Sequence, residues 1–282
     1  MILRVYLFFL GVIIIIFSIA HVKKSRETIW RVASFFGILN VISLAYILGI
    51  YAMFVLVSLI LLLSIYELAK NYKVRYPTPL AVVVIGCYLL MVYFESYLIY
   101  FIPAFLLQVG LTFAGTLNMI RNPCYVYFLG VMSLAISSAS LVALYSMNPD
   151  AIVFLIAMLA FNDVTGYFAG RKFGKTRIFK ILSPNKTLEG YIGGLGGLLV
   201  GLILFHTIIP VLAGTSLLQN FILFTTMFIF GNAGDLLFSK IKRSVGIKDF
   251  SKLLPGHGGI LDRFDSALTV SPLLFMFLYY MK

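Results

Sequence analysis

Charged residues are scarce in this chain of 282 residues. They make up 11% of it, against about a quarter in an ordinary soluble domain, and 61% of the residues are hydrophobic. The short segments of alternating polarity that build a strand barrel are also missing. Instead, runs of 16 to 24 apolar residues recur, the length that a helix needs to cross about 30 Å of hydrocarbon. The sequence therefore excludes a soluble domain and predicts an all-α fold, a polytopic membrane helical bundle.

Cysteine is nearly absent as well. Cys87 and Cys124 are the two in the chain, and both lie in or beside apolar runs. Two separated thiols make neither a disulfide framework nor a thiolate metal site, so we expect them to pack as small core side chains. The chain also has no Ser-His-Asp order with elbow glycines, no Gly-x-x-x-x-Gly-Lys-Ser/Thr loop and no dinucleotide fingerprint. These absences argue against the reaction classes that depend on those motifs.

About ten transmembrane helices are predicted. They cover residues 5–20, 32–48, 51–68, 80–94, 97–117, 125–147, 151–168, 188–210, 217–238 and 267–280. With ten spans, the loops on one side of the membrane hold 20 of the 22 Lys and Arg residues. Basic loops favour the cytoplasm, so this excess predicts that the polar loops are cytoplasmic and that both termini lie outside. The same rule explains the net charge of +12 without nucleic acid as a partner.

The first apolar run, from Val5 to Ala20, allows two interpretations. Arg4 precedes it and a small-residue end resembles a cleavage site, as in a signal peptide. The basic residues that follow the run favour an uncleaved anchor instead. We interpret residues 1–120 as an N-terminal transmembrane bundle that includes this additional helix. Residues 121–282 are then a catalytic transmembrane domain with cytoplasmic loops.

A polar stretch from Asp235 to Asp265 interrupts this apolar pattern. It holds four of the ten acids and six of the 22 basic residues, with apolar sequence on both sides. Ionisable groups beside hydrocarbon are costly and by default mark a functional site. The glycines around His257 let the backbone approach a ligand closely, and no plain turn requires a histidine there. We therefore expect this stretch to carry chemistry.

The carboxylates of this region have a spacing that can bring them together. Asp235 shares a helix face with Ser239 and Lys242, and Asp262 would neighbour Asp265 three residues later on the next helix. Carboxylates that converge at the cytoplasmic membrane boundary form an oxygen-rich site for a hard cation such as Mg²⁺. The alternative is that these acids only neutralise nearby Lys and Arg side chains.

The basic loop before the eighth span has two open interpretations. Residues 183–190, Ser-Pro-Asn-Lys-Thr-Leu-Glu-Gly, stand where a loop enters a helix, and backbone N–H groups there suit a phosphate together with Lys186. A Ser or Thr shortly before a Glu is equally a common helix cap. Arg171 and Lys175 likewise fit either phosphate binding or plain cytoplasmic anchoring.

The residues from Ser239 to Asp265 resemble a known family pattern, that of the phosphatidate cytidylyltransferases (CDP-diacylglycerol synthases). The residues that fill its fixed positions are Ser239, Ile241, Lys242, Arg243, Lys248, Asp249, Ser251, Leu254, Pro255, His257, Gly258, Gly259, Ile260, Asp262, Arg263 and Asp265. Residues 162–175 and 183–190 resemble further motifs of the family. The resemblance covers residues 161–265 well. We call residues 239–265 the signature segment.

The resemblance implies a nucleotidyltransferase that converts CTP and phosphatidate to CDP-diacylglycerol and pyrophosphate during phospholipid synthesis. It implies Mg²⁺ in a two-cation site, and CTP, phosphatidate and the bilayer as partners. A bacterial inner membrane, with the active site facing the cytoplasm, is the expected location. Whether the chain is a monomer or a homodimer is left open.

The resemblance also implies roles for individual residues. Asp235 and Asp262 are expected to be the main metal ligands, with Asp163 and Asp265 in support. Lys186 and Asp249 are expected to be catalytic as well. The expected substrate-binding residues are Arg171, Lys175, Ser183, Asn185, Glu189, Ser239, Lys242, Arg243, Lys248, His257, Gly258, Gly259 and Arg263.

Two rival functions share parts of this pattern. One is a related CTP-dependent enzyme that acts on another membrane lipid phosphate or on a polyprenol. The other is an anion transporter, with intramembrane Asp163 and a helix broken near residues 231–234 along its pathway. No internal repeat supports the transporter.

Overall fold

Helices dominate every part of the chain that the computed structural model describes, which is residues 26–73, 77–114, 123–179, 182–208, 214–254 and 258–281. The elements in chain order are α2 (Arg26–Leu48), α3 (Ile50–Tyr72), α4 (Pro77–Tyr93), the 3₁₀ helix η1 (Glu95–Phe101), α5 (Ile102–Ala114), α6 (Pro123–Met147), α7 (Asp150–Phe173), α8 (Leu188–Ile208), α9 (Leu217–Ser244) and α10 (Leu261–Met281). Within these ranges no strand forms beyond two isolated bridges, Arg177 with Thr187 and Leu254 with Gly258. The predicted all-α class is confirmed.

Five of the described helices are long and apolar enough to cross a membrane: α3, residues 127–147 of α6, α7, α9 and α10. Four shorter apolar helices accompany them, at Phe36–Leu48, Ala81–Tyr93, Leu98–Leu107 and Leu188–Leu204. The protein is therefore an integral membrane protein. The predicted count of about ten spans is not confirmed by these helices. The run from Val5 to Ala20 lies outside the described residues.

Several predicted boundaries differ from the structure. α2 begins and α7 and α9 end five or six residues beyond their predicted limits, and two further differences have a clear physical reason. The span predicted for residues 97–117 is divided into η1 and α5, and Pro103 stands at the start of α5, where its missing N–H costs nothing. The last helix begins at Leu261, six residues before its predicted start, because acidic side chains supply partners for its first N–H groups.

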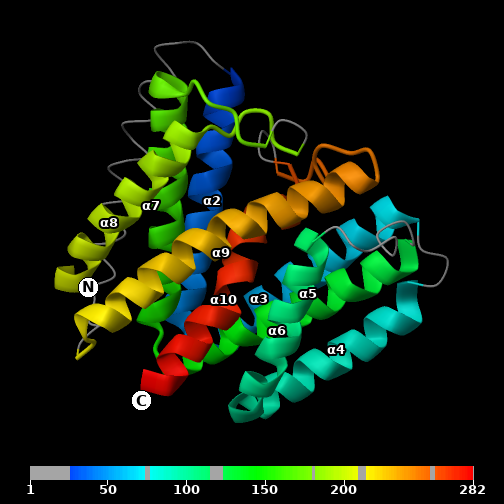
Figure 1. The fold of residues 1–282 in the computed structure, drawn as a ribbon. Coiled ribbons are helices and arrows are strands. Elements are labelled where there is room, and N and C mark those ends of the chain that lie inside the picture. Colours follow the sequence, from blue (N-terminus) through cyan, green and yellow to red (C-terminus); the bar gives the residue numbers. More distant parts are fainter. Residues whose placement is uncertain are drawn as a thin grey trace.

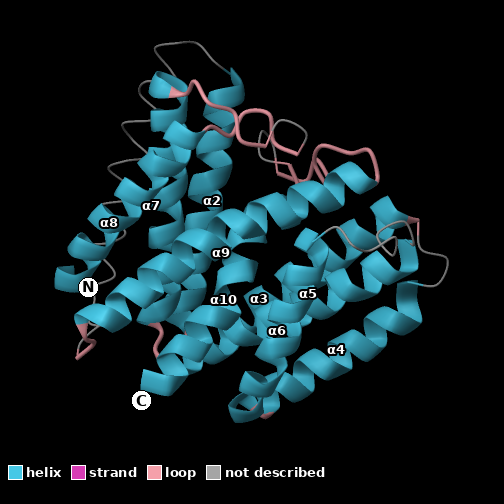
Figure 2. Ribbon diagram, viewed as in Figure 1, coloured by secondary structure: helices cyan, strands magenta, loops and turns pink. Residues whose placement is uncertain are grey.

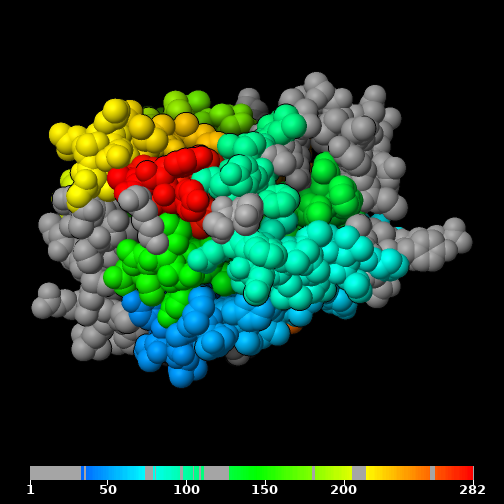
Figure 3. Space-filling view, turned by 90° about the horizontal axis from the view of Figure 1, so that it is seen from below, coloured from blue at the N-terminus to red at the C-terminus, as the bar shows by residue number. Residues whose placement is uncertain are grey.

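The helices form one layered bundle. In Figure 1, α7 and α8 run alongside each other at one side, while α9 crosses the molecule and packs against α10. α6 is the central helix of the other half and contacts α3, α4 and α10. Seen from below, α10 lies beside the start of α9, α4 and α5 cover the middle of the face, and α2 and α3 lie at the edge (Figure 3).

The polar loops gather at one edge of the bundle. The loop between α7 and α8 and the loop that follows α9 both lie there, as Figure 2 shows. These loops contain the residues between Gly174 and Thr187 and those between Val245 and Ile260. The helices thus bring the two segments with family-like motifs to the same end of the molecule.

Small residues let α7 and α8 approach to backbone contact. A Cβ atom added at Gly166 would lie 3.1 Å from the carbonyl oxygen of Gly190, and one added at Gly190 would lie 3.1 Å from that of Gly166. In lipid, such close packing drives helix association, because burial of apolar surface gives little advantage there. The glycines of α7 and α8 thus allow the two helices to touch along their backbones.

Two adjacent glycines of α8 test this packing. A Cβ at Gly197 would meet the Thr165 side chain and lie 2.7 Å from Phe161 O, whereas a Cβ at Gly196 meets nothing within 4 Å. We expect Gly197→Ala to lower the free energy of unfolding by about 1–3 kcal/mol through overpacking. Gly196→Ala should leave it unchanged or raise it by up to about 1 kcal/mol through helix propensity.

The measurement is reversible unfolding of both purified variants in the same detergent, followed by circular dichroism. The two substitutions are the same chemical change one residue apart, so each serves as the control for the other. Equal stability of the two variants would show that α7 and α8 do not pack as described.

Candidate active site

A cleft of about 540 Å³ lies where α7, α8 and α9 meet. The acids that line it are Asp163 on α7 and Asp235 on α9, and the cations are Arg171 and Lys186. Glycines of α7 and α8 also line it, so that backbone replaces side chains along part of the wall. A volume of this size is ordinary for a small-molecule site. The cleft is therefore large enough for a ligand and carries charges of both signs.

The central contact of the cleft is an ion pair between Lys186 and Asp235. Lys186 Nζ lies 2.7 Å from Asp235 Oδ2, with 21% and 40% of the two side chains exposed. Burial lowers the pKa of Lys186, but Asp235, Tyr191 and Asp163 together raise it by more, so the pKa lies above its ordinary value. The ammonium is thus held charged in a place that a ligand can reach.

Further carboxylates lie within electrostatic range of Asp235. Both Asp163 and Asp265 interact with it, and Asp163 also interacts with Arg263. Asn162 donates to Asp163 Oδ1 over 3.1 Å. Over the described part of the chain, no group of three or more His, Cys, Asp or Glu residues is arranged to hold a metal ion. The cleft itself offers two carboxylates and neighbouring amide oxygens.

Asp262 makes a different set of contacts. Its Oδ1 accepts from Lys242 Nζ at 2.6 Å, and its Oδ2 accepts from the backbone N–H groups of Phe250 at 2.8 Å and Gly259 at 2.9 Å. The Asp262 side chain is 2% exposed and that of Lys242 10%. In this structure Asp262, on α10, thus binds both Lys242 of α9 and the loop that connects the two helices. Its role as a metal ligand stays a prediction.

For the loop of residues 183–190, the sequence left open a helix cap or a phosphate contact. The structure assigns these two roles to different residues. Thr187 Oγ1 accepts from the Gly190 N–H over 3.2 Å, which is a helix cap. The Glu189 carboxylate accepts from the N–H groups of Lys175 and Thr176 over 3.0 and 3.2 Å. Lys186, one residue before the cap, instead faces the cleft. The cap and the expected phosphate contact are therefore neighbours in the chain.

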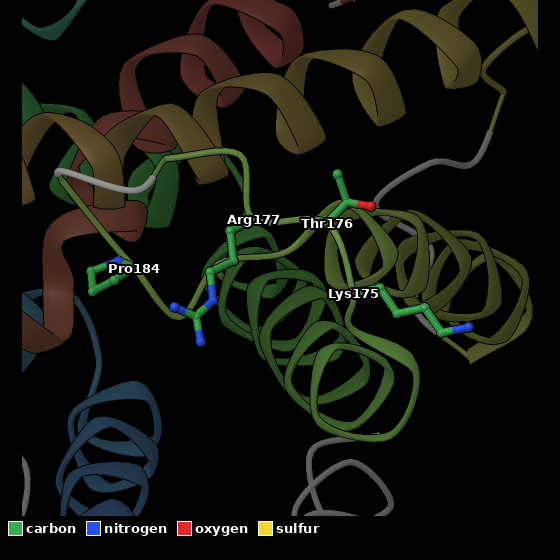
Figure 4. Close-up of a pocket in the computed structure, with 4 residues that line it drawn as sticks. All are labelled: Lys175, Thr176, Arg177 and Pro184. Carbon is green, nitrogen blue, oxygen red and sulfur yellow. The ribbon is translucent and has the colours of Figure 1, made fainter.

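A second hollow of about 660 Å³ lies on the same loop. It is lined by Lys175, Thr176, Arg177 and Pro184. Figure 4 shows the Lys175 and Arg177 side chains leaving the loop in different directions. None of the residues that line this hollow is acidic, and the charges do not converge. The structure thus places Lys175 apart from Asp235.

The remaining expected residues of α9 and its following loop have mainly local contacts. Ser239 Oγ lies 3.5 Å from Asp235 Oδ1, and Arg243 donates to Ile247 O over 2.6 Å, which closes the turn after the helix. Lys248 and Asp249 are exposed beyond that turn. Their expected roles in substrate binding and catalysis stay predictions.

Other expected residues have structural explanations or lie outside the description. Gly258 has a φ of +87°, which favours glycine. Ser183 O accepts from the backbone N–H of Lys186 over 3.1 Å, and Asn185 lines the cleft. His257 lies outside the described residues.

Several residues of this region were not among the expected site residues. Tyr167, Tyr191 and Asn232 line the cleft, and Tyr167 OH accepts from the Arg171 guanidinium over 3.1 Å. Glu67, on α3, accepts hydrogen bonds from the signature segment. An acid at the end of an apolar run is a signal that could have singled out Glu67. The aromatic residues carry no such signal, because tyrosines are spread along all the spans.

Comparison with known proteins gives this geometry a family context. A family model described as "Cytidylyltransferase family" matches residues 29–281. A phosphatidate cytidylyltransferase of Bacillus subtilis strain 168 is 43% identical over 119 residues, which is 42% of this chain and 43% of the relative. One of Staphylococcus saprophyticus is 39% identical over 148 residues, 51% of this chain and 56% of the relative.

A third relative bears no functional name. The Escherichia coli K12 protein named "Uncharacterized protein YnbB" is 38% identical over 129 residues, 46% of this chain and 42% of the relative. The chain spans about half the length of these curated relatives.

Loss of the lysine should destabilise the two ion pairs to very different extents. Lys242→Met leaves the Asp262 carboxylate buried without its cation, and we expect a loss of about 3–5 kcal/mol in the free energy of unfolding. Lys186→Met leaves Asp235 able to reach solvent, and we expect a loss of about 0–1 kcal/mol. Denaturant unfolding of the two purified variants in one detergent measures both values. Equal losses would contradict the assignment of a structural pair and a ligand-accessible pair.

Proposed function

We propose that this chain, which belongs to the cytidylyltransferase family, transfers a cytidylyl group from CTP to phosphatidate and releases pyrophosphate. The names of the Bacillus and Staphylococcus relatives support this reaction. The observation that carries the proposal is the cleft, where the charges of Lys186 and Asp235 are paired but still accessible. A phosphate group and a cation would each find an opposite charge there.

The chemistry is an in-line displacement at phosphorus. A phosphate oxygen of phosphatidate forms a bond to the α-phosphorus of CTP, and the bond from that phosphorus to the oxygen bridging to the β-phosphate breaks. Pyrophosphate leaves with that electron pair. A phosphomonoester is already nucleophilic near neutral pH, so the site needs no strong general base. Its task is to position the two phosphates and to stabilise charge.

The donors in the cleft fit a magnesium ion. Mg²⁺ takes oxygen ligands and is commonly held by one or two carboxylates together with substrate phosphates. Asp163 and Asp235 supply two such carboxylates, and Asn162 an amide oxygen beside them. We propose that these residues hold Mg²⁺, with Asp265 in support. Asp262 would complete a two-cation site only by exchanging its contact with Lys242 for the second cation. Such ions neutralise charge on the transferring group when bound.

The cations of the cleft would bind phosphate oxygens. Lys186 would exchange its contact with Asp235 for a phosphate of CTP and keep its charge, which the surroundings favour. Arg171 is exposed and is oriented by Tyr167, and its guanidinium can hold two phosphate oxygens at once. Arg263 would add positive charge from the α10 side, where it interacts with Asp163.

The same proposal covers location. The predicted excess of Lys and Arg in loops on one side supports a cleft that faces the cytoplasm, and bacterial relatives support an inner membrane. The acyl chains of phosphatidate would stay in hydrocarbon beside the helices while the headgroup enters the cleft. The division at residue 120 and a homodimer stay predictions.

The test is release of pyrophosphate from CTP by purified protein in detergent micelles with phosphatidate and Mg²⁺. We expect release only when phosphatidate is present. Another lipid phosphate or a polyprenol as the better acceptor would favour the related enzyme. Passage of anions across vesicles without any release would favour the transporter.

One helix provides a matched pair of variants for the same assay. Asp163→Asn removes a carboxylate of the cleft and should lower kcat/KM at least about 100-fold, or about 2.7 kcal/mol. Asp150→Asn makes the same change 13 residues earlier on α7, where Asp150 accepts from Tyr46 OH over 2.6 Å, and should leave kcat/KM within about twofold. Equal activity of both variants would remove Asp163 from the mechanism.

A further inference from the structure

The first turn of α10 is held by an acid from a helix distant in the chain. Glu67, near the end of α3, is 3% exposed. Its Oε1 accepts from Ser251 Oγ at 2.6 Å and from the N–H of Ile260 at 3.0 Å, and its Oε2 accepts from the N–H of Leu261 at 3.0 Å. Both carboxylate oxygens are therefore committed to the signature segment.

These bonds satisfy groups that a helix cannot satisfy by itself. The first N–H groups of a helix lack partners within it, and the helix dipole favours a negative charge at that end. Here Glu67 binds the N–H groups at positions 260 and 261, and Asp262 binds that of Gly259. Two acids thus share the start of α10, and Asp262 keeps its other oxygen for Lys242.

Gly259 shows how close the contact is. A Cβ atom at this position would lie 2.6 Å from both carboxylate oxygens of Glu67. Any side chain there would have to displace the carboxylate. Gly259 thus makes room for Glu67. This packing explains a glycine at position 259 separately from the ligand contact that the sequence suggested.

The end of α3 is fastened to the same segment at two more points. Asn71 Nδ2 donates to Phe250 O over 2.8 Å, and Tyr72 OH donates to Ile241 O over 3.0 Å. Glu67, Asn71 and Tyr72, which make these contacts, lie within two turns of α3. This helix therefore acts as a fixed support for the signature segment.

We propose that Glu67 is a positioning residue for the transfer reaction: by holding the first turn of α10, it places Arg263 and Asp265 beside the cleft. Arg263 lies two residues after Leu261, and Asp265 lies one helical turn after Leu261. Both interact electrostatically with acids of the cleft, Arg263 with Asp163 and Asp265 with Asp235. The effect of Glu67 on the transfer reaction rests on the proposed function. Its role in holding the first turn of α10 rests on the contacts alone.

The test compares Glu67→Gln with Glu95→Gln, the same change on an exposed residue of η1. Glutamine has one acceptor oxygen where glutamate has two, so it cannot serve all three donors. We expect hydrogen exchange of a peptide covering residues 258–265 to speed up at least tenfold in Glu67→Gln and kcat to fall at least tenfold. The KM for CTP should rise by a smaller factor than kcat falls, because Arg263 loses its support while Arg171 and Lys186 stay in place in the cleft. Glu95→Gln should match the wild type throughout.

Faster exchange without a loss of kcat, or unchanged exchange, would overturn the inference. An equal rise in exchange over the α7 peptides would do so too, since it would mark general unfolding. If Glu67→Gln does not fold, Glu67→Asp, which keeps the charge on a shorter side chain, takes its place with the same criteria. Absence of transfer by the wild-type protein would overturn the proposed function instead, and the two failures are separable because exchange needs no substrate.

Discussion

The ion pair between Lys242 and Asp262 is the contact on which the polar end of this molecule depends. A charge taken out of water among apolar helices must be paired and hydrogen-bonded, or its desolvation costs several kcal/mol. Asp262 meets that requirement with a lysine from α9 and two N–H groups of the segment between the helices. Glu67 meets it with three donors from the same segment. Satisfying these two acids sets the path of the chain from α9 to α10.

The cleft follows the opposite principle. Lys186 and Asp235 are paired, but both stay partly exposed, and within the described residues no hydrogen bond between either side chain and the backbone accompanies the pair. The wall beside them is made of glycines, so a ligand can approach the backbone. The network around Asp262 and Glu67 is thus rigid, with its hydrogen bonds satisfied. It supports the neighbouring pair of Lys186 and Asp235, which can exchange partners. That division suits a reaction in which charged phosphates must enter and leave without disturbing the bundle.

The sequence was most informative where a single physical rule decides the outcome. Apolar length predicted the helical class, and the concentration of charge between Asp235 and Asp265 predicted where the polar loops gather. The number of spans was not confirmed, because apolar length does not distinguish a crossing helix from a shorter packed one. The partner of Asp262 could not be predicted, since Lys242 lies 20 residues earlier, on another helix. Glu67 lies over 180 residues from the segment that it holds, and no local pattern reports a contact of that separation.

The central claim is that the accessible ion pair of Lys186 and Asp235 binds a phosphorylated ligand. The most direct measurement is the transfer of radioactive label from the α-phosphate of CTP to the lipid extract by purified wild-type protein and by Lys186→Met. The account predicts that the wild type labels the lipid and that the variant, although folded, labels it at least about 100 times more slowly. Labelling at the wild-type rate by Lys186→Met would contradict it.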